Sequence, residues 1–216
     1  NQSYKDIEII CVDSKEQPDK LTESVAKKYG KYLLYGPERS NKRNFGARNS
    51  DGKYLLFIDT DLILSPSIIM ECVQLMDENK MILIPENSYG IGFWAKVKSF
   101  ERSMYTGGDI AQAGRFFDRE LFFDVGGYDP NIVGAEDLDL FNKLRIKGVE
   151  PIEIKGRLDH NEGKVTLRGA SKRIIYYSKS FKEYKKRYPD IAKKQFTLLR
   201  PTYFRNWKKM VKHPIL

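Results

Sequence analysis

The stretch "YLLFIDTDLILSP" (residues 54–66) joins an apolar run to two carboxylates that stand one residue apart. Residues 55–58 have the composition of a strand buried inside a sheet. Asp59 and Asp61 do not suit that setting, because a buried carboxylate is costly unless it is paired or bound to a cation. The stretch therefore predicts a buried strand whose end carries two acids with a charged partner.

The segments around this stretch alternate between strand-like and helix-like patterns. Strands are expected at residues 7–13, 31–36, 53–59 and 81–86, and helices at residues 19–30, 40–50 and 65–80. Repeated strand–helix units predict a doubly wound, mostly parallel α/β sheet with flanking helices. Ligands bind at the carboxyl ends of the strands in such sheets. Asp13 and Asp59 each end a predicted strand, so both are expected on one rim.

The second half of the chain is less regular. Helices are expected at residues 91–105, 119–127 and 136–148, and strands at 111–118 and 149–160, the latter at a sheet edge. From about residue 166 the chain becomes basic, aromatic and mostly helical. We therefore expect one α/β domain at residues 1–165 and a helical C-terminal appendage at residues 166–216.

The composition is that of a globular protein. Of 216 residues, 41% are apolar and 31% charged, which excludes a disordered chain. No apolar stretch reaches the roughly 18–20 residues of a membrane span. Cys11 and Cys72 lack metal-ligand spacing and are expected to be buried, reduced thiols. Of the net charge of +9, residues 172–212 carry +12, from 14 Lys and Arg against two acids, and the rest carries −3.

Asp59 and Asp61 suit a divalent cation. Carboxylates at positions i and i+2 after a strand can both reach Mg²⁺ or Mn²⁺, which favour one or two carboxylates plus phosphate oxygens. The alternative is a turn in which an Asp caps the next helix. Ser65 and Pro66 already start that helix, which favours the metal site.

Two further motifs admit both a structural and a functional reading. In "NFGARN" (44–49), Arg48 and Asn49 offer donors for phosphate or a base edge, or the helix simply packs through its small residues. In "GAEDLDL" (134–140), Glu136 and Asp137 open a helix, whose dipole stabilises acids there. The functional alternative is a general base held ionised at the helix start. His160 ends a predicted strand and is either a surface residue or a ligand.

The order of these motifs resembles that of family-2 glycosyltransferases of the GT-A fold. The resemblance covers about residues 1–165, and its strongest pieces are "GARNSDGKYLLFIDTD" (46–61) and "VGGYDPNIVGAEDLDLFNKLRIKG" (125–148). It implies an inverting, metal-dependent transfer of a hexosyl-type sugar from a nucleotide-diphosphate sugar to an acceptor hydroxyl. The acceptor would be a glycan or a lipid-linked or membrane-bound molecule.

The resemblance also implies roles for single residues. Asp59, Asp61 and His160 would hold Mn²⁺ or Mg²⁺, with Asp61 the more direct ligand. Asp137 would be the catalytic base and Glu136 its neighbour at the acceptor. The nucleotide would be bound by Asp13, Arg48, Asn49 and Asp59, and Arg145 would contact the acceptor or the diphosphate.

The chain departs from the family pattern in two places. A Gly/Ser/Thr-Asp turn usually follows the first strand, whereas this chain has "SKEQPD" (14–19). Relatives also begin with a further strand and helix, so a unit of roughly 30 residues is expected to be missing from the start of the domain. That strand would line the nucleotide pocket.

Three other classes remain open. A phosphohydrolase of the haloacid dehalogenase type also has D-x-D after a strand, but it wants Thr or Val where Ile63 stands and places the motif near its N-terminus. A basic nucleic-acid-binding protein would explain residues 172–212 but not the acids. A GT-A scaffold without activity is the third.

The basic C-terminal segment is interleaved with aromatic residues. They are Tyr176, Tyr177, Phe181, Tyr184, Tyr188, Phe196, Tyr203, Phe204 and Trp207. Basic and aromatic side chains together suit an anionic membrane surface, and they also suit nucleic acid. A helical appendage with a solvated basic face is the simpler alternative. We expect residues 172–212 to meet an anionic membrane, no nucleic acid to bind, and a cytoplasmic protein at the inner face of that membrane.

Overall fold

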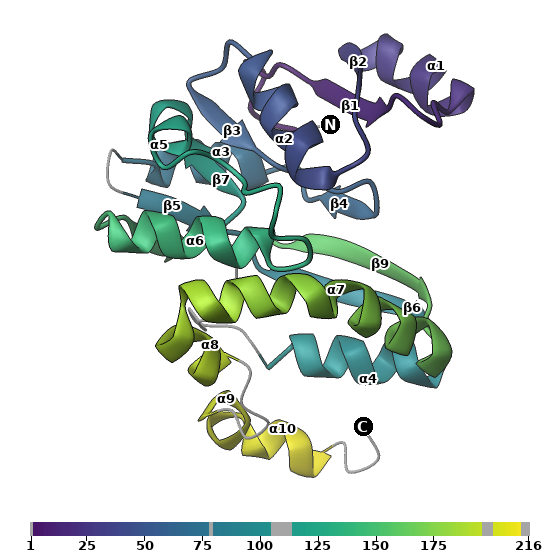
Figure 1. Cartoon of the computed structure of the whole chain (residues 1–216), viewed down its shortest axis with the longest axis vertical. Helices are drawn as coiled ribbons and strands as arrows, with labels where there is room; N and C mark the ends of the chain where they lie inside the picture. The colour runs from purple at the N-terminus through teal and green to yellow at the C-terminus, as the bar shows by residue number, and fades with distance from the viewer. Residues whose placement is uncertain (1, 78–79, 105–113, 196–200, 213–216) are drawn as a thin grey trace.

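The computed structural model describes residues 2–77, 80–104, 114–195 and 201–212 (Figure 1). The strands are β1 (Ile10–Ser14), β2 (Lys31–Tyr35), β3 (Tyr54–Leu56), β4 (Leu62–Leu64), β5 (Lys80–Leu83), β6 (Glu86–Ile91), β7 (Phe116–Asp118), β8 (Glu150–Glu153) and β9 (Leu158–Lys164). The helices are α1 (Lys20–Tyr29), α2 (Arg39–Arg48), α3 (Ile68–Leu75), α4 (Phe93–Arg102), α5 (Arg119–Asp124), α6 (Glu136–Ile146), α7 (Leu167–Arg187), α8 (Pro189–Gln195), α9 (Pro201–Arg205) and α10 (Trp207–Lys212). Phe196 and the predicted strand residues 111–113 lie outside the described residues.

The described strands form three sheets rather than one. Their orders are β1-β2, β3-β7-β5-β8 and β4-β9-β6. β1–β2, β5–β8 and β6–β9 are parallel, whereas β7 is antiparallel to β3 and β5, and β9 is antiparallel to β4. The prediction of a mostly parallel sheet was therefore wrong, although the α/β class is confirmed. Strand patterns record burial and not direction, so the reversed β7 and β9 gave no signal.

The four-stranded sheet lies between two helical layers. Alternate residues of β5 point to opposite faces of the sheet, so this strand contributes side chains to the packing on both faces. One face packs on α5 and α6, and the other packs on α3. The first cluster includes Met81, Leu83, Phe117, Phe122, Leu140 and Leu144, and the second includes Ile68, Cys72, Ile82, Ile84, Phe116 and Leu158. Each such buried side chain stabilises the fold by roughly 1.5–3 kcal/mol. The well-packed sheet therefore holds the loops that follow its strands in fixed positions.

The predicted edge strand at residues 149–160 is two strands, β8 and β9, in different sheets. The chain turns at Gly156, whose backbone N–H donates to Glu71 Oε2 at 2.9 Å. β9 is also a central strand: His160 is in register with Leu62 of β4 on one side and with Ser88 of β6 on the other. This pairing places His160 directly beside the end of the Asp59–Asp61 loop.

The C-terminal helices begin with α7, whose N-cap Thr166 accepts the backbone N–H of Gly169. α7 and α8 pack on the loop that leads into α6, and Figure 1 shows α7 lying alongside α6. The buried contact includes Ile132, Ala135, Tyr184, Tyr188 and Ala192. Within the described residues, no helix combines the length and apolar character needed to cross a bilayer.

Candidate active site

Two acids predicted from separate motifs meet at one arginine. Arg43 of α2 donates from Nη2 to Asp59 Oδ1 at 2.7 Å and from Nη1 to Asp137 Oδ1 at 3.0 Å. Asp59 lies in the loop after β3, and Asp137 lies in the first turn of α6. The structure thus brings the predicted metal motif and the candidate base to the two ends of one guanidinium group.

Arg43 is held firmly in place. Its neighbour Asn44 is buried and exchanges hydrogen bonds with the backbone N–H and C=O of Tyr128, at 3.0 and 2.7 Å. The guanidinium carbon of Arg43 lies 5.1 Å from the centre of the Tyr128 ring. Burial favours the neutral guanidine, but Asp137 and Asp59 outweigh burial and raise the pKa of Arg43. The group is therefore a fixed positive charge.

Arg115 extends the cluster from the other side of Asp59. The backbone N–H of Phe57 donates to Arg115 C=O at 3.0 Å, which continues the pairing of β3 with β7. Arg115 Nη1 then lies 3.7 Å from Asp59 Oδ2, and its Nη2 donates to Glu86 Oε1 at 2.5 Å. Burial raises the pKa of Asp59, but Arg43 and Arg115 outweigh it and keep that pKa below its ordinary value. Asp59 is therefore ionised, with a guanidinium group beside each oxygen.

Glu86 connects this group to the third predicted ligand. His160 Nδ1 lies 2.8 Å from Glu86 Oε2, and His160 Nε2 lies 3.2 Å from Asp61 Oδ2. Arg102 of α4 also contacts Glu86 and lies 2.6 Å from His160 Nδ1. Burial opposes ionisation of Glu86, but His160, Arg115 and Arg102 lower its pKa to about 2. The hydrogen bond to Glu86 in turn raises the pKa of His160.

Asp61 and His160 fit a divalent cation that also binds substrate oxygens. The described residues contain no cluster of three or more His, Cys, Asp or Glu side chains able to hold a metal ion. Mg²⁺, however, is usually bound by one or two protein groups plus phosphate oxygens. Metal-binding histidines commonly donate their second ring N–H to a carboxylate, and Glu86 stands at that position. Asp59 fits less well, because Arg43 and Arg115 already neutralise it.

Glu136 and Asp137 differ in exposure although they are adjacent. The Glu136 side chain is buried and pairs with Arg39 Nη2 at 2.8 Å. Burial and the neighbouring Asp137 raise the pKa of Glu136. The Asp137 side chain is 38% exposed. Asp137 is therefore the acid that a substrate could reach.

Asp13 lies apart from this cluster. It belongs to the separate β1–β2 sheet and accepts hydrogen bonds from the backbone N–H of Ser14 and Asp19 and from the Tyr32 hydroxyl. Asp59 belongs to a loop of a different sheet, so the two acids do not share one sheet rim as predicted. The proposed contact of Asp13 with the nucleotide stays a prediction.

Three other predicted residues lie at the far ends of the two site helices. Arg48 and Asn49 are exposed at the C-terminal end of α2, and Asn49 Nδ2 donates to Phe45 C=O. Arg145 is exposed in the last turn of α6, about 12 Å along the helix axis from Asp137. The structure does not bring these three side chains to the acid cluster, and their roles stay predictions.

Sequence reasoning missed the basic half of the site. Arg39 and Arg43 stand four residues apart on a helix and so share a face, which was a usable signal next to two acidic motifs. Glu86 and Arg115 gave no signal, because their meeting depends on β6 and on the antiparallel β7.

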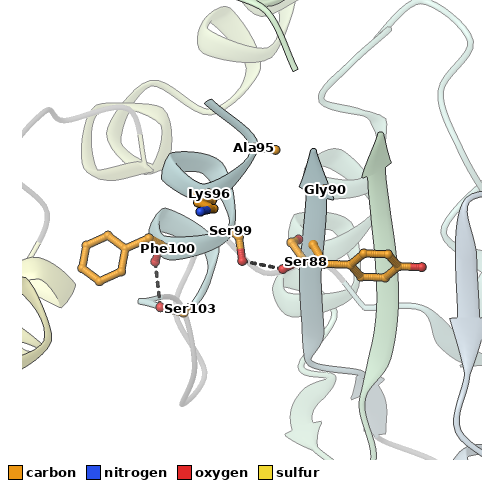
Figure 2. Close-up of a pocket in the computed structure, with 8 residues that line it drawn as sticks. Ser88, Gly90, Ala95, Lys96, Ser99, Phe100 and Ser103 are labelled. Carbon is orange, nitrogen blue, oxygen red and sulfur yellow. Dashed lines mark hydrogen bonds between the residues drawn. The ribbon is translucent and has the colours of Figure 1, made fainter. Parts of the chain in front are cut away.

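A pocket of about 390 Å³ lies between β6 and α4, close to His160. Figure 2 shows Ser99 of α4 turned toward Ser88 of β6, and Ser88 is the register partner of His160. The Ser88 hydroxyl oxygen is buried, and no described residue gives it a hydrogen-bond partner. The lining residues are Ser88, Tyr89, Gly90, Ala95, Lys96, Ser99, Phe100 and Ser103.

Comparison with known proteins identifies the family. The model of the family described as "Glycosyl transferase family 2" matches residues 1–127, more than half of the chain. The chain belongs to glycosyl transferase family 2. The predicted family is therefore confirmed, and the match includes Asp59, Asp61 and Arg43.

Relatives of this family-2 chain are distant. The minor teichoic acid biosynthesis protein GgaB of Bacillus subtilis (strain 168) is 26% identical over 83 residues, which is 36% of this chain and 9% of GgaB. Among solved structures, S. aureus TarS matches with a TM-score of 0.59 and 13% identity, over 83% of this chain and 39% of TarS. A Pyrobaculum calidifontis mannosyltransferase, in complex with GDP-Man and Mn²⁺, matches with a TM-score of 0.63 and 17% identity, over 96% of this chain and 61% of that enzyme. These structures share the fold, and this chain spans only part of each relative.

Proposed function

We propose that the chain forms the catalytic part of an inverting glycosyltransferase that moves a sugar from a nucleotide-diphosphate sugar to an acceptor hydroxyl. The observation that carries this proposal is the bridge from Asp59 through Arg43 to Asp137. It sets a half-exposed acid at a helix start opposite the loop that carries Asp61. One TarS structure holds UDP and the mannosyltransferase holds GDP-Man, which supports a sugar-nucleotide donor for this chain.

Asp61 and His160 would bind the donor's diphosphate through Mn²⁺ or Mg²⁺. A cation held there would neutralise charge on the leaving diphosphate as a Lewis acid. Glu86 orients the His160 ring from behind, and Arg115 fixes Glu86. Asp59, neutralised by Arg43 and Arg115, keeps the loop that presents Asp61 in place.

Asp137 would be the general base. It takes the proton of the acceptor hydroxyl while that oxygen forms a bond to the anomeric carbon. The bond between that carbon and the diphosphate oxygen breaks at the same time, and the diphosphate leaves with the electron pair from the face opposite the attack. The sugar configuration is therefore inverted without a covalent enzyme intermediate. Glu136, buried against Arg39, would border the acceptor side.

Replacing Asp137 by Asn tests the proposal. Loss of a general base lowers the turnover number by about 10²–10⁴-fold, while the carboxamide keeps the shape of the site. We expect Asp137→Asn to lose transfer and also metal-dependent hydrolysis of the donor. Retention of more than about a tenth of the wild-type turnover, well short of that range, would remove Asp137 from this role. A phosphoryl group trapped on Asp59 would instead favour the phosphohydrolase alternative.

For the acceptor side we propose a glycan or lipid-linked molecule at an anionic membrane that residues 172–212 contact. Three apolar side chains of α9 and α10 are open to solvent: Phe204, Trp207 and Val211 are 65%, 56% and 67% exposed. This segment is tied to the end of α4, where Asn206 and Lys209 donate to the backbone carbonyls of Met104 and Ser103. Exposed apolar side chains interleaved with lysines are typical of helices that lie on anionic lipid.

Co-sedimentation with liposomes tests this contact. We expect binding to vesicles containing anionic phosphatidylserine and weaker binding to vesicles of neutral phosphatidylcholine. Trp207→Ser and Lys208→Glu should each weaken that binding, with about 1 kcal/mol lost per basic residue removed near the surface. Lys28→Glu on α1, at the opposite end of the molecule in Figure 1, is the charge-matched control. Equal binding by Lys208→Glu and Lys28→Glu would contradict the proposal.

A further inference from the structure

Arg43 contacts Asp59 and Asp137 at once, and neither the motif around Asp59 nor the motif around Asp137 predicts this contact. Its single guanidinium group joins two carboxylates that lie 16 and 94 residues further along the chain, one on each side of the site. The Arg43 side chain is only 12% exposed, whereas the Asp59 and Asp137 side chains are each 38% exposed. A buried cation therefore stands behind two acids that open toward solvent.

Among the described residues, a hydrogen bond is made to only one of the two carboxylate oxygens of Asp137, the candidate base. Arg43 Nη1 binds Asp137 Oδ1 at 3.0 Å, and the same nitrogen lies 3.5 Å from Glu136 Oε1. A base whose first oxygen is fixed presents its second oxygen in a defined direction. Catalytic bases are commonly oriented in this way by a third group.

We propose that Arg43 is a positioning residue. By binding Asp59 and Asp137 at once, it holds Asp137 in a fixed position relative to the loop between β3 and β4 that carries Asp59 and Asp61. The role rests on the proposed function of Asp137 as the base. Arg43 does not take part in proton transfer, and it acts on the reaction only through the two acids. The bridge needs a planar group with donors on two nitrogens, which lysine lacks.

A stability cycle tests the bridge without any substrate. Free energies of unfolding are measured in urea for the wild type, Arg43→Gln, Asp137→Asn and the double variant. We expect Asp137→Asn to lower stability in the wild-type background but not in the Arg43→Gln background, because Asp137 there has no guanidinium group to lose. If the losses in free energy of unfolding caused by the two substitutions simply add in the double variant, the proposal that Arg43 and Asp137 interact is wrong. If Arg43→Gln does not fold, Arg43→Lys replaces it in the cycle.

Kinetics test the positioning role. The probe is the fastest-hydrolysed compound among UDP-, GDP- and dTDP-sugars with Mn²⁺, with water as acceptor. Misplacement of a catalytic group by about 1 Å can cost on the order of 10²-fold, so we expect a loss in kcat of that size for Arg43→Gln. Arg43→Lys should recover only part of it, and the KM for the donor should change less than kcat in both.

Lys42→Gln is the matched control, since it removes one positive charge from the adjacent residue of the same helix. Its kcat should stay near the wild-type value. Full recovery by Arg43→Lys, or equal losses in Arg43→Gln and Lys42→Gln, would overturn the positioning role and leave only a charge effect. A coupled stability cycle in a wild type that neither binds nor hydrolyses any of the three donors would instead show that the proposed function is wrong, and the positioning role would be wrong with it.

Discussion

Arg43 and Arg187 each join two carboxylates, but their surroundings differ. Arg187 of α7 donates to Asp129 Oδ2 at 2.7 Å and to Asp139 Oδ1 at 2.8 Å. The Asp139 side chain is fully buried, and Tyr188 and Lys143 also contact its two oxygens. At Arg43 the relation is reversed, because the cation is buried and the acids are exposed.

This difference separates the structural ion pairs of Arg187 from the candidate active site around Arg43. Around Asp139, a hydroxyl, an ammonium and a guanidinium group enclose the carboxylate, and the cluster fixes α7 to α6. Around Asp59 and Asp137, the protein supplies positive charge from behind and leaves the outer side open. Asp137, exposed at the start of α6, is able to meet a substrate, whereas Asp59 already has a guanidinium group beside each oxygen.

The largest expected effect on stability is at Asp139. Removing one member of a buried ion pair costs roughly 3–5 kcal/mol, and we expect about 3 kcal/mol for Asp139→Ala because Arg187 can turn toward water. Asp137→Ala, two residues earlier on the same helix, should cost no more than about 1 kcal/mol, as at exposed pairs. Urea unfolding of both variants measures this contrast, and equal losses would contradict the distinction between the clusters.

The next effect concerns metal affinity. Loss of a group that orients a metal-binding histidine costs about 10–100-fold in affinity. We expect Glu86→Gln to weaken Mn²⁺-dependent donor binding by that factor, whereas Asp129→Asn in the structural cluster should leave it unchanged. Calorimetric titration of the donor with and without Mn²⁺ provides the comparison. Unchanged affinity in Glu86→Gln would show that His160 does not bind the metal.

The smallest effect is the pH dependence of stability at Asp129. Burial alone would raise the pKa of Asp129, but the Asn131 N–H and Arg187 outweigh burial and lower it. A carboxyl group with a lowered folded-state pKa stabilises the protein above its ordinary pKa of about 3.9, and this contribution is lost as the pH falls through the lowered value. Asp129→Asn should therefore flatten the decline in the urea midpoint as the pH falls below about 4. An unchanged slope would contradict the shift.

Much of the α/β alternation and the acidic half of the cluster could be predicted from the sequence. Apolar periodicity revealed the strands near Asp13 and Asp59, and the helix start at Glu136 was clear from its acids. The direction of β7 and the central place of β9 could not be predicted, because pairing partners are set by tertiary packing. Arg115 and Glu86 depend on those pairings, so they appeared only in the structure.

The most direct measurement is a calorimetric titration of UDP-, GDP- and dTDP-sugars, with and without Mn²⁺, into the wild type, Asp61→Ala and Asp137→Asn. The account predicts that at least one donor binds the wild type with Mn²⁺. It also predicts that Asp61→Ala loses the Mn²⁺-dependent part of the affinity, and that Asp137→Asn binds like the wild type. Binding of none of the donors, or equal losses in the two variants, would contradict the division into a metal-binding side and a base.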